Sequence, residues 1–184
     1  MEKRKSMSYC IKCGHELIEK ENGIDGMVPY CPNCQEFRFP MFNSAVSALV
    51  LNPKKDKILL IQQYGRKDNI LIAGYVTKGE NAKQALFREI KEETGCDVEL
   101  NGVCYIANRI LEDDLRIMVF FNAKLVNENI KYDKNEILDV KWIGYDEIMN
   151  KMDDELRGSY VKTAVYNKKN NLIAPIEIVD VLND

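Results

Sequence analysis

The chain has 184 residues, a formal net charge of −3, and 46% hydrophobic and 30% charged residues. This balance is typical of a folded globular protein and excludes a disordered chain, and a slightly acidic protein has no overall charge that would attract nucleic acid. No stretch approaches the ~20 apolar residues of a membrane span. The basic start MEKRKSMSYC is not followed by the apolar run of a secretion signal. We therefore expect a cytoplasmic protein that does not contact a membrane.

Residues 1–39 are predicted to form a small zinc ribbon. Two CxxC pairs, CIKC and CPNC, have the separation expected of a four-thiolate zinc site. Two disulfides are the alternative, which a reducing cytosol disfavours. Four sulfur ligands leave no open coordination position, so this Zn²⁺ is expected to be structural, and it would stabilise a segment too short for its own core. The predicted ligands are Cys10, Cys13, Cys31 and Cys34.

Residues 40–184 are predicted to form a second domain of the α+β class, a mixed sheet with helices packed on it. Strand-like apolar runs lie at 44–52, 57–64, 69–77, 103–108, 116–125 and 137–143. Helical segments are predicted at 80–93, 145–152 and 154–170. The tail, residues 171–184, fits either a strand or a dimer contact.

The helix predicted at 80–93 has clear boundary signals. Asn81 can cap its first turn, and Gln84 completes a capping-box pair with it. Gly95 stands where a left-handed residue commonly ends a helix.

Three carboxylates lie on one face of this helix, because Glu89, Glu92 and Glu93 are spaced at i, i+3 and i+4. Like charges at this spacing repel each other. A solvated acidic face is one interpretation. The other is a site for a hard cation such as Mg²⁺, which prefers carboxylate oxygens. The loop AGYVTKG (73–79), which leads from a strand into this helix, favours the metal site.

The residues that carry this pattern resemble the Nudix box. They are Gly74, Glu80 and the run Arg88-Glu89-Ile90-Lys91-Glu92-Glu93-Thr94-Gly95. The resemblance implies an α/β/α sandwich that uses Mg²⁺ or Mn²⁺ to hydrolyse the pyrophosphate bond of a nucleoside diphosphate linked to another moiety. Cys96 departs from the pattern, which usually has an aliphatic residue there, but cysteine is a small hydrophobe and should pack in that place.

The same resemblance implies roles for individual residues. Glu89, Glu92, Glu93 and the Gly74 carbonyl become the expected metal ligands, and Glu80 and Arg88 are expected to orient the loop and helix. Glu136, just before ILDVKWI, is similar in position to an additional carboxylate of the family, with a surface glutamate as the alternative. Either Glu89 or Glu136 would take the proton of the attacking water.

A zinc ribbon directly ahead of a Nudix domain resembles the NADH pyrophosphatase branch of the family. Tyr75 in AGYV would then stack on a base, unless it packs on its own loop. The Ser-Gln-Pro-Trp-Pro-Phe-Pro-x-Ser motif of that branch is missing from this sequence. The substrate is therefore left open among NAD(H), ADP-ribose and similar dinucleotides, with NAD-capped RNA as a further candidate and a homodimer implied by the resemblance.

Two other functions are compatible with the sequence. One is a nucleoside triphosphate pyrophosphohydrolase. The other is a zinc-ribbon regulator that binds nucleic acid or senses a ligand, which the net charge of −3 and the complete acidic triad disfavour. Tight RNA binding without metal-dependent turnover would identify the regulator.

Overall fold

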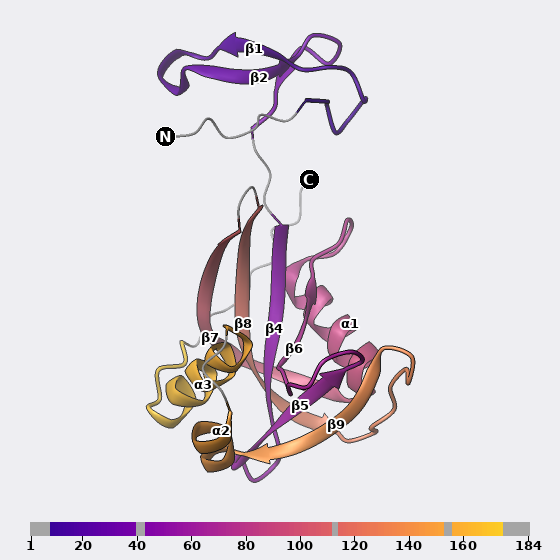
Figure 1. The fold of residues 1–184 in the computed structure, drawn as a ribbon, viewed down its shortest axis with the longest axis vertical. Helices are drawn as coiled ribbons and strands as arrows, with labels where there is room; N and C mark the ends of the chain where they lie inside the picture. Colours follow the sequence, from indigo (N-terminus) through magenta and orange to yellow (C-terminus); the bar gives the residue numbers. More distant parts are fainter. Residues whose placement is uncertain (1–7, 40–42, 112–113, 153–155, 175–184) are drawn as a thin grey trace. The chain divides into compact units, whose positions relative to one another are not determined.

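The computed structural model describes residues 8–39, 43–111, 114–152 and 156–174. The chain divides into two compact units, one built mainly from residues 1–42 and the other from most of the rest. Among the described residues, no helix has both the length and the apolar character needed to cross a membrane. Figure 1 shows the elements of both units.

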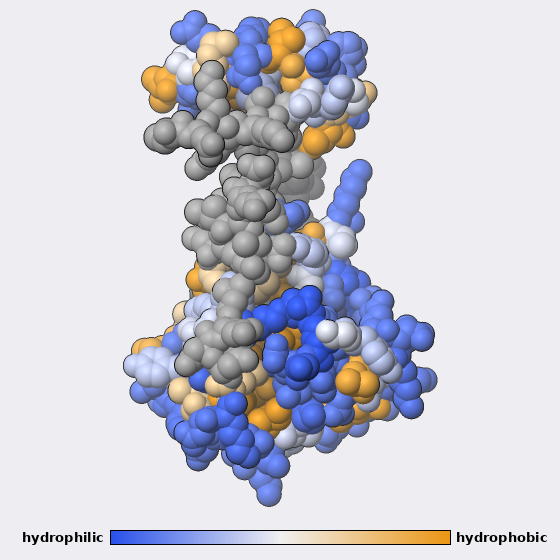
Figure 2. Space-filling model, viewed as in Figure 1, coloured by the Kyte–Doolittle hydropathy of each residue, from blue (hydrophilic) through white to orange (hydrophobic). Residues whose placement is uncertain are grey.

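The N-terminal unit is a small three-stranded antiparallel sheet with the strand order β1-β2-β3. Its elements are β1 (Ile18–Glu21), the 3-10 helix η1 (Gly23–Asp25), β2 (Met27–Cys31) and β3 (Glu36–Phe37). In the described part of this unit, the buried hydrophobic residues are Cys10, Val28 and Cys31. Large apolar side chains such as Ile24 and Met27 are exposed instead, and hydrophobic patches interrupt the hydrophilic surface in Figure 2. Such a small core cannot by itself stabilise a fold.

The second unit is built on a mixed sheet with the order β7-β8-β4-β5-β9, and β6 pairs with β4 off this path. β4 runs parallel to β8 and antiparallel to β5 and β6, and β5 runs antiparallel to β9. The strands are β4 (Asn43–Leu51), β5 (Lys57–Gln63), β6 (Ile72–Tyr75), β7 (Asp97–Leu111), β8 (Asp114–Asn127) and β9 (Ile137–Gly144).

Helices cover both faces of this sheet. They are α1 (Ala82–Thr94), α2 (Tyr145–Lys151) and α3 (Leu156–Lys169), with α1 on one side and α2 and α3 on the other in Figure 1. The core under α1 includes Val46, Ile72, Leu86 and Ile90. The core under α2 and α3 includes Leu49, Phe120, Ile148 and Val161. The predicted α/β/α sandwich with a mixed sheet is confirmed.

Helix α1 begins and ends at the predicted signals. The Asn81 side chain accepts a hydrogen bond from the Gln84 backbone N–H at 2.8 Å, and the Gln84 side chain accepts one from the Asn81 N–H at 2.9 Å. Gly95 follows the helix with φ 74°, and a Cβ at this position would overlap the backbone of Asn129 and Lys131. Only glycine fits both requirements without strain.

Some predicted boundaries were wrong. β6 is shorter than the strand predicted at 69–77. The segment 109–115, which separates two predicted strands, mostly belongs to β7 and β8, because these strands are hydrogen-bonded neighbours and the sheet supplies partners for a polar stretch. β4 begins at Asn43, one residue before the strand predicted at 44–52. The undecided tail beyond residue 174 lies outside the described residues.

Candidate functional site

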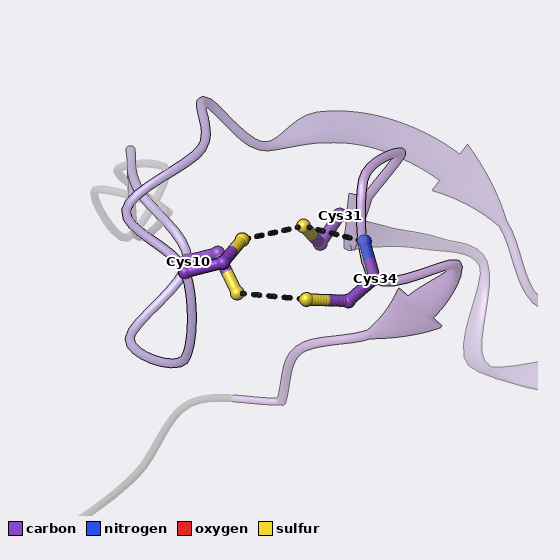
Figure 3. Close-up of side chains that lie close together, drawn as sticks. Cys10, Cys31 and Cys34 are labelled. Atoms are coloured by element: carbon purple, nitrogen blue, oxygen red, sulfur yellow. Dashed lines mark hydrogen bonds between the residues drawn. The ribbon is translucent and has the colours of Figure 1, made fainter.

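The four predicted zinc ligands converge in the N-terminal unit. Their sulfur atoms lie within 4.8 Å of one another, with Cys13 Sγ 3.5 Å from Cys31 Sγ and Cys10 Sγ 4.0 Å from Cys34 Sγ. Figure 3 shows Cys10 on one segment directing its side chain toward Cys31 and Cys34, which lie on one turn of another segment. A tetrahedral Zn²⁺ with Zn–S bonds of about 2.3 Å would hold its sulfurs roughly 3.8 Å apart, so the spacing fits the ion.

The electrostatics of this cluster also fit a cation. Hydrogen bonding with Cys13, followed by burial, raises the pKa of the Cys34 thiol to about 12. Burial also raises the pKa of Cys10, but hydrogen bonds from Arg38 Nε, at 3.1 Å, and from the backbone outweigh it and bring that pKa to about 6. The four sulfurs therefore cannot all be thiolates unless a cation balances them. All six cysteines are free thiols, so the disulfide alternative is not what the structure contains.

In the second unit, Arg88 fixes the loop before α1. Its guanidinium donates to both carboxylate oxygens of Glu80, at 3.0 and 2.7 Å, and to the Tyr75 carbonyl at 3.1 Å. Glu80 in turn accepts from the Thr77 backbone N–H at 2.8 Å and from its hydroxyl at 2.6 Å. These bonds, the one from Arg88 above all, lower the pKa of Glu80 to about 2, and Glu80 raises the pKa of Arg88. Glu80 and Arg88 thus bind each other and the loop, and their role in orienting the loop and helix for the reaction stays a prediction.

Glu89 lies against Gly74, the last residue but one of β6. Its side chain is only 15% exposed and pairs with Arg88 Nη1 at 2.6 Å. A Cβ at position 74 would overlap the Glu89 carboxylate. Glycine is therefore required at this position by the close approach of a carboxylate, and not by its backbone conformation.

Glu93 is the buried member of the triad, with only 8% of the residue exposed. Burial, with the charges of Glu89 and Glu136, raises the pKa of Glu93 to about 8, although hydrogen bonds from the Ala73 N–H and the Gln63 side chain oppose the shift. The Ala73 bond is 3.3 Å long. A buried carboxylate with this environment would be stabilised in its charged form by a bound cation.

The third glutamate differs from the other two. The Glu92 side chain is 61% exposed, and its carboxylate lies 3.1 Å from Arg88 Nη1. Within the described part of the chain, only the four cysteines bring three or more ligand atoms within 4.8 Å of one another. The glutamates therefore surround one region without converging on one point, and Arg88 pairs with Glu89 and Glu92.

Glu136 comes to this region from a distant part of the sequence. Its carbonyl accepts a hydrogen bond from Tyr64, just beyond β5, at 3.1 Å, and its N–H donates to Asp133 at 3.2 Å. The Asp133 side chain caps the same turn by accepting from the Asn135 N–H at 2.8 Å. The negative charge of Glu136 contributes to the raised pKa of Glu93. Glu136 therefore joins Glu89, Glu92 and Glu93 in one acidic cluster.

A pocket of about 170 Å³ adjoins the acidic residues on the α3 side of the sheet. Ala73 and Gly74 of β6 and Gln63 of β5 form the wall nearest the glutamates. The rest of the lining is Ala45, Ser47, Ile70, Leu71, Tyr75, Met118, Phe120, Arg157, Tyr160 and Val161. Tyr75 is 44% exposed and lines the pocket, and its contact with a base stays a prediction.

The hollow arises from small residues in the middle strand. Ala45 of β4 lies in register with Tyr75 of β6 and Met118 of β8, and Ser47 lies in register with Ala73 of β6 and Phe120 of β8. Short side chains beside long ones leave space on that face of the sheet.

Apart from Gly74 and Tyr75, the residues that line the pocket were not found as site residues by sequence reasoning, and Gln63, Arg157 and Tyr160 are examples. Each is an ordinary polar or aromatic residue with no motif around it, so nothing in the sequence distinguished it. Two other basic residues, Arg66 and Lys78, are exposed and do not line the pocket.

Comparison with known proteins bears on the second unit. Residues 41–163 match the family model described as NUDIX domain. The NAD-capped RNA hydrolase NudC of Pectobacterium carotovorum subsp. carotovorum (strain PC1) is 27% identical over 146 residues, which cover 78% of this chain and 54% of that protein. The NAD-capped RNA hydrolase NudC of Shigella flexneri is 27% identical over 147 residues, with the same coverage. This chain thus spans about half the length of the curated relatives it matches.

Solved structures show the same fold. A NUDIX hydrolase from Nitrosomonas europaea superposes with a TM-score of 0.66 at 23% identity, covering 89% of this chain and 93% of that one. A C. elegans Ap4A hydrolase superposes with a TM-score of 0.57 at 17% identity, covering 71% and 97%. The family model matches more than half of the chain, so the predicted Nudix hydrolase fold is confirmed, and the chain belongs to the NUDIX domain family.

Proposed function

We propose that this chain is a divalent-metal-dependent pyrophosphohydrolase that cleaves the diphosphate of an NAD-type dinucleotide. The observation that carries the proposal is a shared wall: β6 has the Glu89 and Glu93 carboxylates on one side and the pocket on the other. A diphosphate at the carboxylates can therefore extend one of its ends into the pocket. The similarity to proteins named NAD-capped RNA hydrolase favours NAD-type substrates, including NAD-capped RNA.

The acidic cluster fits Mg²⁺ or Mn²⁺. Both ions prefer oxygen ligands, and Glu89, Glu92, Glu93, Glu136 and the Gly74 carbonyl are the proposed donors. Burial and the charges of Glu89 and Glu136 raise the pKa of Glu93, and a bound cation would favour its charged form. When bound, the ion would neutralise charge on the phosphate oxygens and polarise a water molecule.

The protein residues have separate tasks in this proposal. Arg88 and Glu80 keep the loop and α1 in a fixed arrangement, so that the carboxylates are held in place before the substrate binds. Glu89 or Glu136 accepts the proton of the attacking water. The oxygen of that water attacks a phosphorus atom of the diphosphate, and the bond between this phosphorus and the bridging oxygen breaks.

We further propose that the four cysteines hold a structural Zn²⁺. The sulfur spacing and the small number of buried residues in the described part of that unit support it. The division into a ribbon at 1–39 and a hydrolase domain at 40–184, the homodimer and the cytoplasmic location remain predictions.

A substrate panel tests the proposed activity. The purified protein, with Mg²⁺ or Mn²⁺, is assayed on NAD⁺, NADH, ADP-ribose, Ap4A, deoxynucleoside triphosphates and NAD-capped RNA. We expect metal-dependent release of two mononucleotides from NAD-type substrates. Turnover of triphosphates alone would replace the proposal with a triphosphate pyrophosphohydrolase. Tight RNA binding without turnover of any nucleotide would indicate a regulator.

A further inference from the structure

The lining of the pocket includes a basic residue, Arg157. Among the described residues that line it, Arg157 is the only one with a formal charge. It lies in the first turn of α3, three positions before Tyr160 and four before Val161, which also line the pocket. This spacing places the three residues on one face of the helix.

Two other polar side chains in the lining, Ser47 and Gln63, form hydrogen bonds within the protein. The Ser47 hydroxyl donates to the Ile72 carbonyl at 2.9 Å, inside the sheet. The Gln63 side chain donates to Glu93. Arg157 also interacts with protein, and its guanidinium carries five N–H donors in a fixed fork, which is more than a single bidentate partner uses.

The helix that carries Arg157 is fixed near this point. The Tyr105 hydroxyl donates to the Tyr160 carbonyl at 2.8 Å. Tyr105 stacks on Phe120 with ring centroids 4.0 Å apart, and Phe120 contacts the Tyr160 ring at 5.3 Å. Arg157 therefore starts from a rigid support one turn away, as a side chain that selects a ligand requires.

The size and lining of the pocket indicate what part of a substrate it takes. A volume of about 170 Å³ is below the ~300–1,000 Å³ of pockets that hold whole drug-sized ligands, so one ring fits and a dinucleotide does not. The lining is mainly aromatic and apolar, which suits a flat ring, while the proposed place of the diphosphate is on the other side of β6.

We propose that Arg157 determines specificity by donating hydrogen bonds to an acceptor group on the ring that occupies the pocket. This inference rests on the proposed function. A carboxylate can accept two parallel N–H bonds from a guanidinium and also pairs with its positive charge, whereas a carboxamide has one acceptor oxygen and no charge. The pocket therefore selects a ring that bears a carboxylate over the same ring with a carboxamide. The preferred substrate class is then a dinucleotide with an acidic, nicotinate-type ring.

Two dinucleotides that differ only in this group provide the kinetic test: nicotinate adenine dinucleotide and NAD⁺. For the wild type we expect kcat/KM to be about tenfold higher with the carboxylate form, mainly through KM. Arg157→Met should bring the ratio close to one, and Arg157→Lys should keep part of it. Lys169→Gln removes one positive charge from α3 at a residue that does not line the pocket, and should leave the ratio unchanged. An unchanged ratio in Arg157→Met would overturn the inference.

A binding measurement separates this inference from the proposed function. Nicotinate mononucleotide, nicotinamide mononucleotide and AMP are titrated calorimetrically into the protein without a divalent cation. Arg157→Met should weaken binding of the first by about tenfold more than binding of the other two. An equal loss for all three would show that Arg157 binds phosphate and would overturn the inference. If the selective loss is seen but no dinucleotide is hydrolysed, the pocket assignment stands and the proposed function fails.

Discussion

The two candidate metal sites of this protein, four cysteines and four glutamates, differ in how closely their ligand atoms approach one another. The cysteine sulfurs lie within 4.8 Å of one another in a unit with few buried residues. The glutamates surround a region beside a well-packed sheet, and Arg88 neutralises part of their charge. A closed set of soft sulfur ligands suits an ion that holds a fold together, and an open set of oxygens suits an ion that must also contact substrate and water.

Removal of zinc is the strongest test of this comparison. Structural zinc sites contribute roughly 10–16 kcal/mol of apparent binding free energy, so Cys31→Ser should eliminate bound zinc and unfold the N-terminal unit. The measurement is elemental analysis, with one zinc per chain expected in the wild type and none in the variant. Cys104→Ser, in the core of the second unit, is the matched control and should keep its zinc. Full zinc content in Cys31→Ser would contradict the assignment.

Substitution of a glutamate should affect turnover and leave the fold intact. Glu92→Gln and Glu93→Gln each remove one proposed ligand charge, and we expect kcat to fall by at least about 100-fold. Glu99→Gln, an exposed residue of β7, is the control and should behave like the wild type. Wild-type turnover in both variants would exclude the triad from catalysis.

Gly74→Ala tests the contact between β6 and the acidic cluster. The new Cβ would overlap the Glu89 carboxylate, so Glu89 must move, and we expect about a tenfold loss in kcat with a loss of stability of about 1–3 kcal/mol. Gly144→Ala is the control, because a Cβ there meets nothing within 4 Å, and it should change the stability by less than about 1 kcal/mol. Equal activity and equal stability of Gly74→Ala and Gly144→Ala would contradict a close contact between β6 and the Glu89 carboxylate.

The smallest expected effect is a change in the free energy of unfolding with pH. The folded-state pKa of Glu80, about 2, lies below the ordinary value of 4.5, so its ionised form stabilises the fold above pH 4.5. That stabilisation is lost as the pH falls toward 2. The difference in unfolding free energy between wild type and Glu80→Gln, measured with urea, should therefore shrink from pH 6 to pH 3. A difference that is constant across this range would show that the ion pair with Arg88 does not stabilise the protein.

Much of the α1 region could be predicted because its determinants are local. Asn81, Gln84 and Gly95 act on residues within one turn of themselves, so the helix boundaries follow from the sequence alone. The spacing of the glutamates likewise placed them on one helix face. It did not reveal that Glu93 is buried while Glu92 is exposed, since that depends on where β6 crosses the helix.

The pocket could not be predicted, because its walls come from distant parts of the chain. Ala45 and Ser47 look like ordinary small strand residues until they are placed between β6 and β8. Arg157 reaches the same space from α3. The strands of the N-terminal unit were also missed. β1 is exposed along its whole length, so it lacks the alternation that identifies a half-buried strand.

The most direct test of the central claim is metal binding at the glutamates. Mn²⁺ is titrated into zinc-loaded wild type and into Glu93→Gln, and bound Mn²⁺ is followed by electron paramagnetic resonance while hydrolysis of an NAD-type dinucleotide is assayed in parallel. We predict that the wild type binds Mn²⁺ and hydrolyses the substrate only when the ion is present. We predict that Glu93→Gln binds it at least about tenfold more weakly. Equal Mn²⁺ affinity in the two proteins, or hydrolysis in the presence of a chelator, would contradict the account.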